Sequence, residues 1–161
     1  SLIISENLID KNNKLIDILK SSNSVSIHIR RHRFSDEMGK DTAENVIKSE
    51  EFTKSIIQYI YRSVDFFQQK INKPKFFIWS NDFSNLEKHF NDDFTFVNNN
   101  NLATDFYLFS LSKHFIVSPS TFHWWGAWLN NNQNKICVRP KDSLLNPSNN
   151  KSFWPDNWIK I

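Results

Sequence analysis

Short runs of apolar residues alternate along this chain with longer segments of helical periodicity. In the longer segments, apolar side chains recur at intervals of three and four, as they do on the packed face of a helix. The short runs are continuous rather than alternating, so each is expected to be a strand that is buried on both faces. This pattern predicts an α/β fold, a doubly wound parallel sheet of about five strands. The expected strands are residues 24–30, 75–80, 94–97, 115–118 and 135–139, and the expected helices are residues 5–20, 49–71, 86–90, 102–113 and 120–130.

Neither a domain boundary nor an internal repeat interrupts this pattern, so residues 1–161 are expected to form a single domain. Residues 31–48 are polar and indicate a long loop, and the tail from Pro140 indicates irregular structure. No apolar run reaches the roughly 18 residues of a membrane span, and no signal peptide is recognised. A single cysteine, Cys137, allows no disulfide framework, which fits a reducing compartment. The net charge of +3 is too small to indicate nucleic-acid binding.

Ligands of doubly wound sheets bind outside the carboxyl ends of the strands. This rule brings residues 28–31, 80–82, 98–101 and 118–121 to one edge of the predicted sheet. Two adjacent arginines, Arg30 and Arg31, end the first strand, and a guanidinium group suits phosphate. Because adjacent strand residues point to opposite faces, one arginine could grip an anion while the other is structural. Structural ion pairs for both are an equal alternative.

The segment from Ser118 to Phe122 joins a strand to a helix. Ser120 or Thr121 can cap the helix, and its free N–H groups can attract phosphate, although ordinary capping explains the segment equally well. The glycine patterns of nicotinamide-binding and P-loop proteins are absent from it. Asp105 lies in the first turn of another expected helix, where it either favours the helix dipole or accepts bonds from N–H groups of a ligand. Without an Asp-x-Asp motif or a cysteine pair, no metal is expected.

Four stretches of the chain resemble glycosyl transferase family 11, the α-1,2-fucosyltransferases that use GDP-L-fucose. They read HIRRHRF, FFIWSND, ATDFYLFSLSKHFIVSPSTFHWWGAWL and FWPDNWIKI, within residues 24–161. The family pattern is similar to HxRRGDY, FFIFSDD, NSTFSWWGAWL and a terminal Pro-x-x-Trp. The resemblance implies the Rossmann-like, sugar-donor-binding half of a B-type glycosyltransferase, with the acceptor-side domain largely absent from this chain. It therefore puts the activity of the isolated segment in question.

Roles for individual residues follow from this resemblance alone. Arg30 matches the arginine that holds the β-phosphate, and His28 matches a histidine near the nucleotide. Asp105 resembles an aspartate that recognises guanine. The resemblance also places residues in contact with the GDP-sugar, and this set comprises His28, Arg30, Arg31, Asp105, Ser118, Ser120, Thr121 and Phe122. Inverting transfer without a metal or other cofactor is implied, with Arg30 as a catalytic group that stabilises the leaving diphosphate.

One departure from the family pattern concerns the residues after HxRR. The usual Gly-Asp-Tyr is replaced by His32, Arg33 and Phe34, so a carboxylate gives way to a positive charge. Asp36 and Glu37 follow closely and are candidate catalytic groups, as a general base or as an arginine partner, while solvated loop carboxylates are the alternative. His123 replaces the usual serine in the last part of the motif.

The leading hypothesis is therefore transfer of L-fucose from GDP-fucose to a galactose-type hydroxyl of a glycan, in bacterial surface-polysaccharide assembly. Two alternatives stay open: an HxRR transferase with another linkage or sugar nucleotide, and a non-catalytic GDP-sugar-binding module. The expected partners are a nucleotide sugar and a glycan acceptor, with no nucleic acid. A cytoplasmic location is expected, and peripheral association with the inner face of the membrane is an open alternative.

Overall fold

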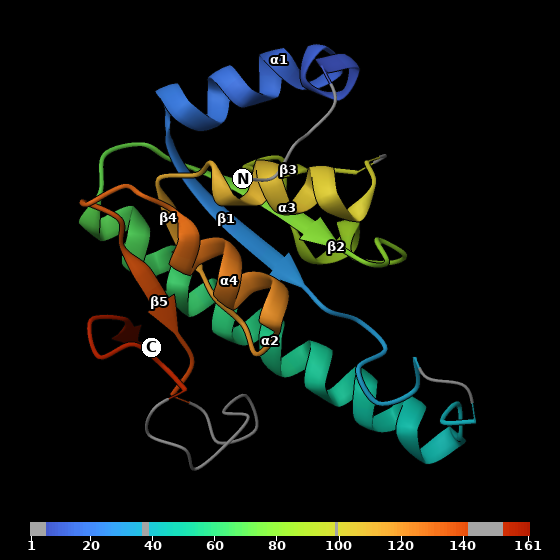
Figure 1. Ribbon diagram of the computed structural model, residues 1–161. Coiled ribbons are helices and arrows are strands. Elements are labelled where there is room, and N and C mark those ends of the chain that lie inside the picture. Colours follow the sequence, from blue (N-terminus) through green and yellow to red (C-terminus); the bar gives the residue numbers. More distant parts are fainter. Residues whose placement is uncertain (1–5, 37–38, 99, 142–152) are drawn as a thin grey trace.

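Helices and strands alternate through the residues that the computed structural model describes, which are 6–36, 39–98, 100–141 and 153–161 (Figure 1). The helices are α1 (Glu6–Ser21), α2 (Ala43–Lys70), the single 3-10 turn η1 (Glu87–His89), α3 (Leu102–Ser110) and α4 (Thr121–Leu129). The strands are β1 (Asn23–Ile29), β2 (Pro74–Ser80), β3 (Phe94–Phe96), β4 (His114–Ile116), β5 (Cys137–Arg139) and β6 (Ile159–Lys160).

The six strands found in the described residues form one parallel sheet in the order β3-β2-β1-β4-β5-β6. From β1 the chain crosses through α2 to β2 on one side, whereas β4 pairs with β1 on the other side. The strand order therefore reverses between β1 and β4, and ligands of doubly wound sheets bind at such a reversal. The predicted α/β fold with a parallel doubly wound sheet is confirmed.

Alternation along β1 divides the molecule into three layers. Val25, Ile27 and Ile29 are fully buried and pack with the apolar face of α2. Ser24, Ser26 and the adjoining end of β1 lie on the opposite face, toward α1, α3 and α4. Figure 1 shows α3 and α4 side by side on that face. Helices consequently cover both faces of the sheet, as continuous apolar strands require.

Small residues let α3 and α4 lie close to the sheet and to each other. The Ser26 hydroxyl donates to the backbone carbonyl of Phe109 at 2.9 Å, which satisfies a carbonyl in the last turn of α3. On α4, a Cβ atom at Gly126 would lie 2.6 Å from Cδ1 of Phe109. The α3–α4 contact therefore depends on the absence of a side chain at residue 126.

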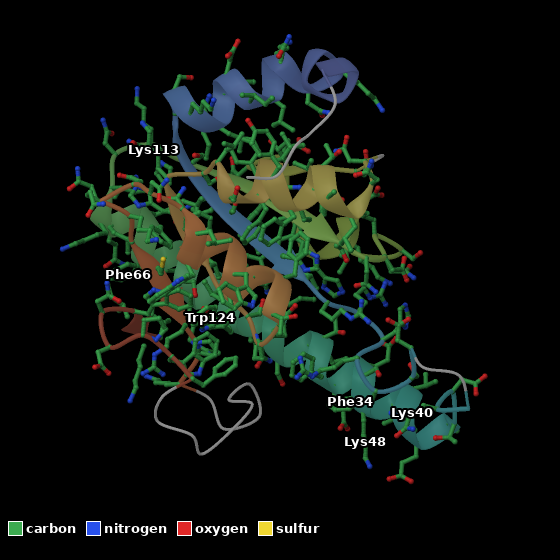
Figure 2. All side chains as sticks on the ribbon, viewed as in Figure 1. Phe34, Lys40, Lys48, Phe66, Lys113 and Trp124 are labelled. Carbon is green, nitrogen blue, oxygen red and sulfur yellow. The ribbon has the colours of Figure 1, made fainter. Side chains whose placement is uncertain are left out.

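Helix α2 begins earlier than the periodicity predicts. Its N-cap is Thr42, whose side chain accepts from the Asn45 N–H at 3.2 Å, so residues expected in a loop are helical. Val46 and Ile47 in this extension are exposed, and the first turns therefore carry no buried stripe to detect. Lys40 and Lys48 mark this end of α2, which lies beyond the sheet (Figure 2).

The expected irregular tail was wrong at its end, because Ile159 and Lys160 add the sixth strand beside β5. Aromatic residues hold this segment against α4 (Figure 2). The indole Nε1–H of Trp124 donates to the Phe153 carbonyl at 2.8 Å, and the Trp124 and Trp158 ring centroids are 5.9 Å apart. A two-residue strand has too little pattern to be seen in the sequence, and tertiary packing decides its position.

Candidate functional site

A cleft of about 970 Å³ opens at the carboxyl ends of the central strands, beside the reversal between β1 and β4. One wall is polar and comes from the segments after β1 and β2, and the other comes from the first turns of α3 and α4. The lining residues are His28, Arg30, Arg33, Ser80, Asn81, Asn100, Leu102, Asp105, Phe106, Pro119, Ser120, Thr121, Phe122, Trp125 and Leu129. The edge predicted from strand polarity is therefore where the cleft lies.

His28 reaches the cleft because it shares the face of β1 that Ser24 and Ser26 occupy. Its ring centroid lies 4.7 Å from that of Phe122 and 4.2 Å from that of His123. Burial, and then the charge of Arg30, lower the pKa of His28 to about 3. The imidazole is therefore neutral at physiological pH, and its buried Nδ1 has no hydrogen-bond partner in the described part of the chain.

Arg30 is the cationic group that ends β1 on the cleft side. Its guanidinium forms an ion pair with the Asp36 carboxylate, and both side chains are partly exposed, at 42% and 39%. Asp36 thus occupies the position of an arginine partner, one of the two roles expected for it. Glu37, the other candidate carboxylate, lies outside the described residues.

Arg31 follows Arg30 just after β1 ends, and its side chain lies away from the cleft. Its guanidinium donates to the Ser84 carbonyl and lies 3.5 Å from Asp82 and 3.8 Å from Glu50. The Arg31 side chain is 10% exposed and does not line the cleft. Its geometry is that of a residue that joins the end of β1 to the loop after β2.

The chain turns sharply after Arg31, through a left-handed residue. His32 has a φ of 56°, a conformation that costs a residue with a side chain about 1 kcal/mol or more and that glycine adopts freely. Its Nε2 lies 2.7 Å from the Asp82 carboxylate, and this contact, with hydrogen bonds from Ser84, holds the pKa of Asp82 well below its usual value. His32 stands where the resembling family has glycine, and this φ gives the physical reason for a glycine there.

The N-terminus of α4 forms part of the second wall of the cleft. Ser120 is the N-cap residue, and its side chain makes no capping hydrogen bond, so the N–H groups of the first turn lack a side-chain partner. Ser120, Thr121 and Phe122 line the cleft. Ser118 does not line it: its hydroxyl donates to the His28 carbonyl at 2.9 Å and fixes β4 to β1.

Asp105 brings an acidic group to the other end of the cleft. It lies in the first turn of α3, whose N-cap Asn101 accepts from the Thr104 N–H at 2.9 Å. Burial raises the pKa of Asp105, against a hydrogen bond from the Asn100 side chain, and its buried Oδ1 has no partner among the residues that the structure describes. A carboxylate held this way is an acceptor that lacks a donor, which a ligand can supply.

Several lining residues were not singled out from the sequence. Arg33 was noted only as a departure from the family pattern, and Phe106 and Trp125 belong to helical segments that indicate packing. Strand polarity did place Ser80, Asn81 and Asn100 at this edge, but it assigned no role to them. Turn geometry brings Arg33 to the cleft, and no pattern in the sequence signals that geometry.

His28 and His32 are not arranged to share a metal ion. His28 and His32 are close in the sequence, yet His28 packs on Phe122 while His32 contacts Asp82. Within the described residues, no group of three or more histidine, cysteine or acidic side chains is arranged to hold a metal ion. No described helix is long and apolar enough to cross a membrane.

Comparison of the sequence with known proteins identifies the family of this chain. The chain is 31% identical to an alpha-1,2-colitosyltransferase of Escherichia coli over 156 residues, which are 92% of this chain and 51% of that protein. It is 30% identical to the O-antigen biosynthesis glycosyltransferase WbnK of Escherichia coli over 150 residues, 89% of this chain and 46% of that protein. The chain thus spans about half the length of these relatives. No solved structure matches it significantly. Residues 3–161 match the family described as glycosyl transferase family 11, and the chain belongs to this family of glycosyltransferases.

Proposed function

We propose that this chain binds the sugar donor in an enzyme that transfers L-fucose from GDP-fucose to a galactose-type hydroxyl of a glycan, with inversion and without a metal. One observation supports this most: an arginine, an uncapped helix N-terminus and a carboxylate with an unpartnered oxygen line the same cleft. Phosphate suits the first two groups, and a base that carries N–H donors suits the third.

Asp105 recognises the guanine base in this proposal. Guanine presents two adjacent donors, the N1–H and the exocyclic amino group, and a carboxylate can accept from both. The raised pKa of Asp105 reflects burial of the carboxylate with few donors, and the N–H groups of the base would supply further donors. Phe106 and Leu102 line the same end of the cleft and offer apolar surface to the base.

Arg30 and the first turn of α4 hold the diphosphate. Cleavage of the sugar–phosphate bond leaves negative charge on GDP, and preorganised donors stabilise that charge as it develops. His28 is neutral, so it contributes a packed wall to the cleft and no positive charge toward the diphosphate. The general base that takes the proton of the acceptor hydroxyl is proposed among Asp36 and Glu37. The ion pair with Arg30 favours the role of arginine partner for Asp36.

The name of one relative points to a second candidate sugar donor. The chain is 31% identical to an alpha-1,2-colitosyltransferase, and colitose differs from fucose by the absence of the hydroxyl at C3. GDP-colitose is therefore the alternative substrate. Steady-state transfer with both donors separates the two, because a site that hydrogen-bonds the C3 hydroxyl discriminates strongly against a sugar without it. The O-antigen relative supports a role in bacterial surface-polysaccharide assembly.

GDP binding tests the proposal directly. GDP present at 100 times its dissociation constant should add about 2.7 kcal/mol to the stability of the intact protein and raise its melting temperature. Arg30→Ala removes charge-assisted hydrogen bonds, so we expect affinity about a hundredfold lower and a residual stabilisation of about 0.4 kcal/mol. The control is Arg62→Ala, on the exposed side of α2.

Other outcomes would redirect the assignment. A folded protein that does not respond to GDP would refute it. Tight GDP binding without transfer or donor hydrolysis would indicate a non-catalytic GDP-sugar-binding module. Loss of transfer in the presence of a chelator, with GDP binding retained, would contradict the metal-independent mechanism.

A further inference from the structure

Arg33 is the charged residue of the cleft that the proposed function has not used. It follows the left-handed His32, and a hydrogen bond at 3.0 Å from the Ser35 N–H to the His32 carbonyl closes the turn. This turn directs Arg33 into the cleft that Arg30 lines. A carboxylate is usual at this position in the resembling family, so the substitution changes the charge of the site.

The guanidinium of Arg33 is held in place by neighbours that carry no opposite charge. One Nη donates to the backbone carbonyl of Pro119, just before α4. The Cζ atom lies 4.9 Å from the centroid of the Phe52 ring, and Phe34 packs edge-on against that ring at 5.8 Å. The Phe34 N–H also donates to the Ser49 hydroxyl at 3.0 Å, so α2 supports the whole turn.

Within the part of the chain that the structure describes, Arg33 differs from its neighbours in lacking a carboxylate partner. Among the described residues, Arg30 pairs with Asp36 and Arg31 lies near Asp82 and Glu50, but no acidic group pairs with Arg33. Burial, and then the charge of Arg30, lower its pKa. A guanidinium offers five N–H donors, and the Pro119 carbonyl is a single acceptor. A half-buried cation with unused donors favours an anion in the cleft.

We propose that Arg33 is a second ligand for the diphosphate of a nucleoside diphosphate, which it holds together with Arg30 and the first turn of α4. The bond to Pro119 keeps the guanidinium beside that turn. This inference rests on the proposed function, because it takes the cleft as the site of a GDP-sugar. In this arrangement, the residue that replaces the family carboxylate contributes to anion binding.

The test separates a phosphate contact from a structural one. Calorimetry on the intact protein gives dissociation constants for GDP, for guanosine and for inorganic pyrophosphate. We expect Arg33→Met to weaken the binding of GDP and of pyrophosphate about tenfold or more, and to change the dissociation constant of guanosine less than twofold. Arg33→Lys should weaken GDP to a smaller extent, since one ammonium cannot reproduce the fork that reaches both Pro119 and phosphate. Arg62→Met is the control, and it should bind all three ligands normally.

Other results overturn the inference. Equal losses for GDP and guanosine would mean that Arg33 acts only by positioning the segment before α4, and unchanged GDP affinity would mean that it does not bind phosphate. If Arg33→Met does not fold, Arg33→Lys decides by the same comparison. GDP binding that depends on Arg30 but not on Arg33 would refute this inference alone, whereas a wild-type protein that does not bind GDP would refute the proposed function as well.

Discussion

At the scale of single residues, the sequence predicts different roles for Arg30 and Arg31, with structural ion pairs for both as an equal alternative. Arg30 and Arg31 are adjacent, so alternation directs them to different surroundings. In the structure Arg30 lines the cleft, and Arg31 is buried against the loop after β2. The roles of His32 and Arg33 were beyond such a rule, because a left-handed turn, and not a strand, sets their directions.

Asp105→Asn should shift the preference of the cleft from guanine toward xanthine. The carboxylate can accept from both donors of guanine, whereas an amide accepts from N1–H and donates to the carbonyl that xanthine has at C2. We expect GDP to bind about ten- to a hundredfold more weakly to the variant, and xanthosine diphosphate to bind more tightly than it does to the wild type. Competition binding with both nucleotides measures the exchange.

Asp65→Asn on the exposed side of α2 is the matched control. Unchanged preference in Asp105→Asn would exclude Asp105 from base recognition. The raised pKa adds a second signature: GDP should bind more tightly to the wild type as pH rises through the pKa of Asp105, because only the ionised form accepts both bonds.

At the scale of elements, the α3–α4 pair sets the width of the cleft. These helices carry Asp105 and the Ser120 N-cap, so their separation fixes the distance between the two ends of the site. Gly126 of α4 faces the ring of Phe109 on α3, and that ring is fully buried.

Gly126→Ala should destabilise the protein although alanine favours helices. The gain in helix propensity is about 1 kcal/mol, whereas overpacking against the Phe109 ring costs about 1–3 kcal/mol. We expect a lower urea midpoint and weaker GDP binding, because α4 must move away from α3. A second substitution, Phe109→Leu, should restore part of the GDP affinity in the double variant. Additive losses would show that the two residues do not interact.

At the scale of the whole molecule, three buried histidines make stability depend on pH. Burial is the main cause that lowers the pKa of His28 to about 3 and the pKa values of His114 and His123 below the ordinary 6.5. The unfolded chain therefore binds protons first as pH falls below about 6.5, and the folded state loses stability. The raised pKa of Asp105 opposes this trend, and the lowered pKa of Asp82 adds to it only below the ordinary 3.8.

The free energy of unfolding should fall between pH 7 and pH 5 by about 2 kcal/mol for each histidine that stays neutral in the folded state. Urea titrations at several pH values measure this slope. His123→Gln keeps a polar side chain that does not titrate. The free energy of unfolding of this variant should therefore fall less steeply with pH, by the contribution of one histidine, whatever its stability at pH 7. An identical slope in this variant would contradict a neutral, buried His123.

The fold class and the edge of the sheet where the cleft opens follow from the amino-acid sequence alone. Both depend on local patterns: continuous apolar strands must be covered on both faces, and the polarity of the chain fixes where their carboxyl ends lie. The sequence did not predict the sixth strand, the early start of α2 or the entry of Arg33 into the cleft. These depend on contacts between distant residues: aromatic packing of the tail on Trp124, the Thr42 cap in a segment without an apolar stripe, and the Pro119 carbonyl that Arg33 contacts across the cleft.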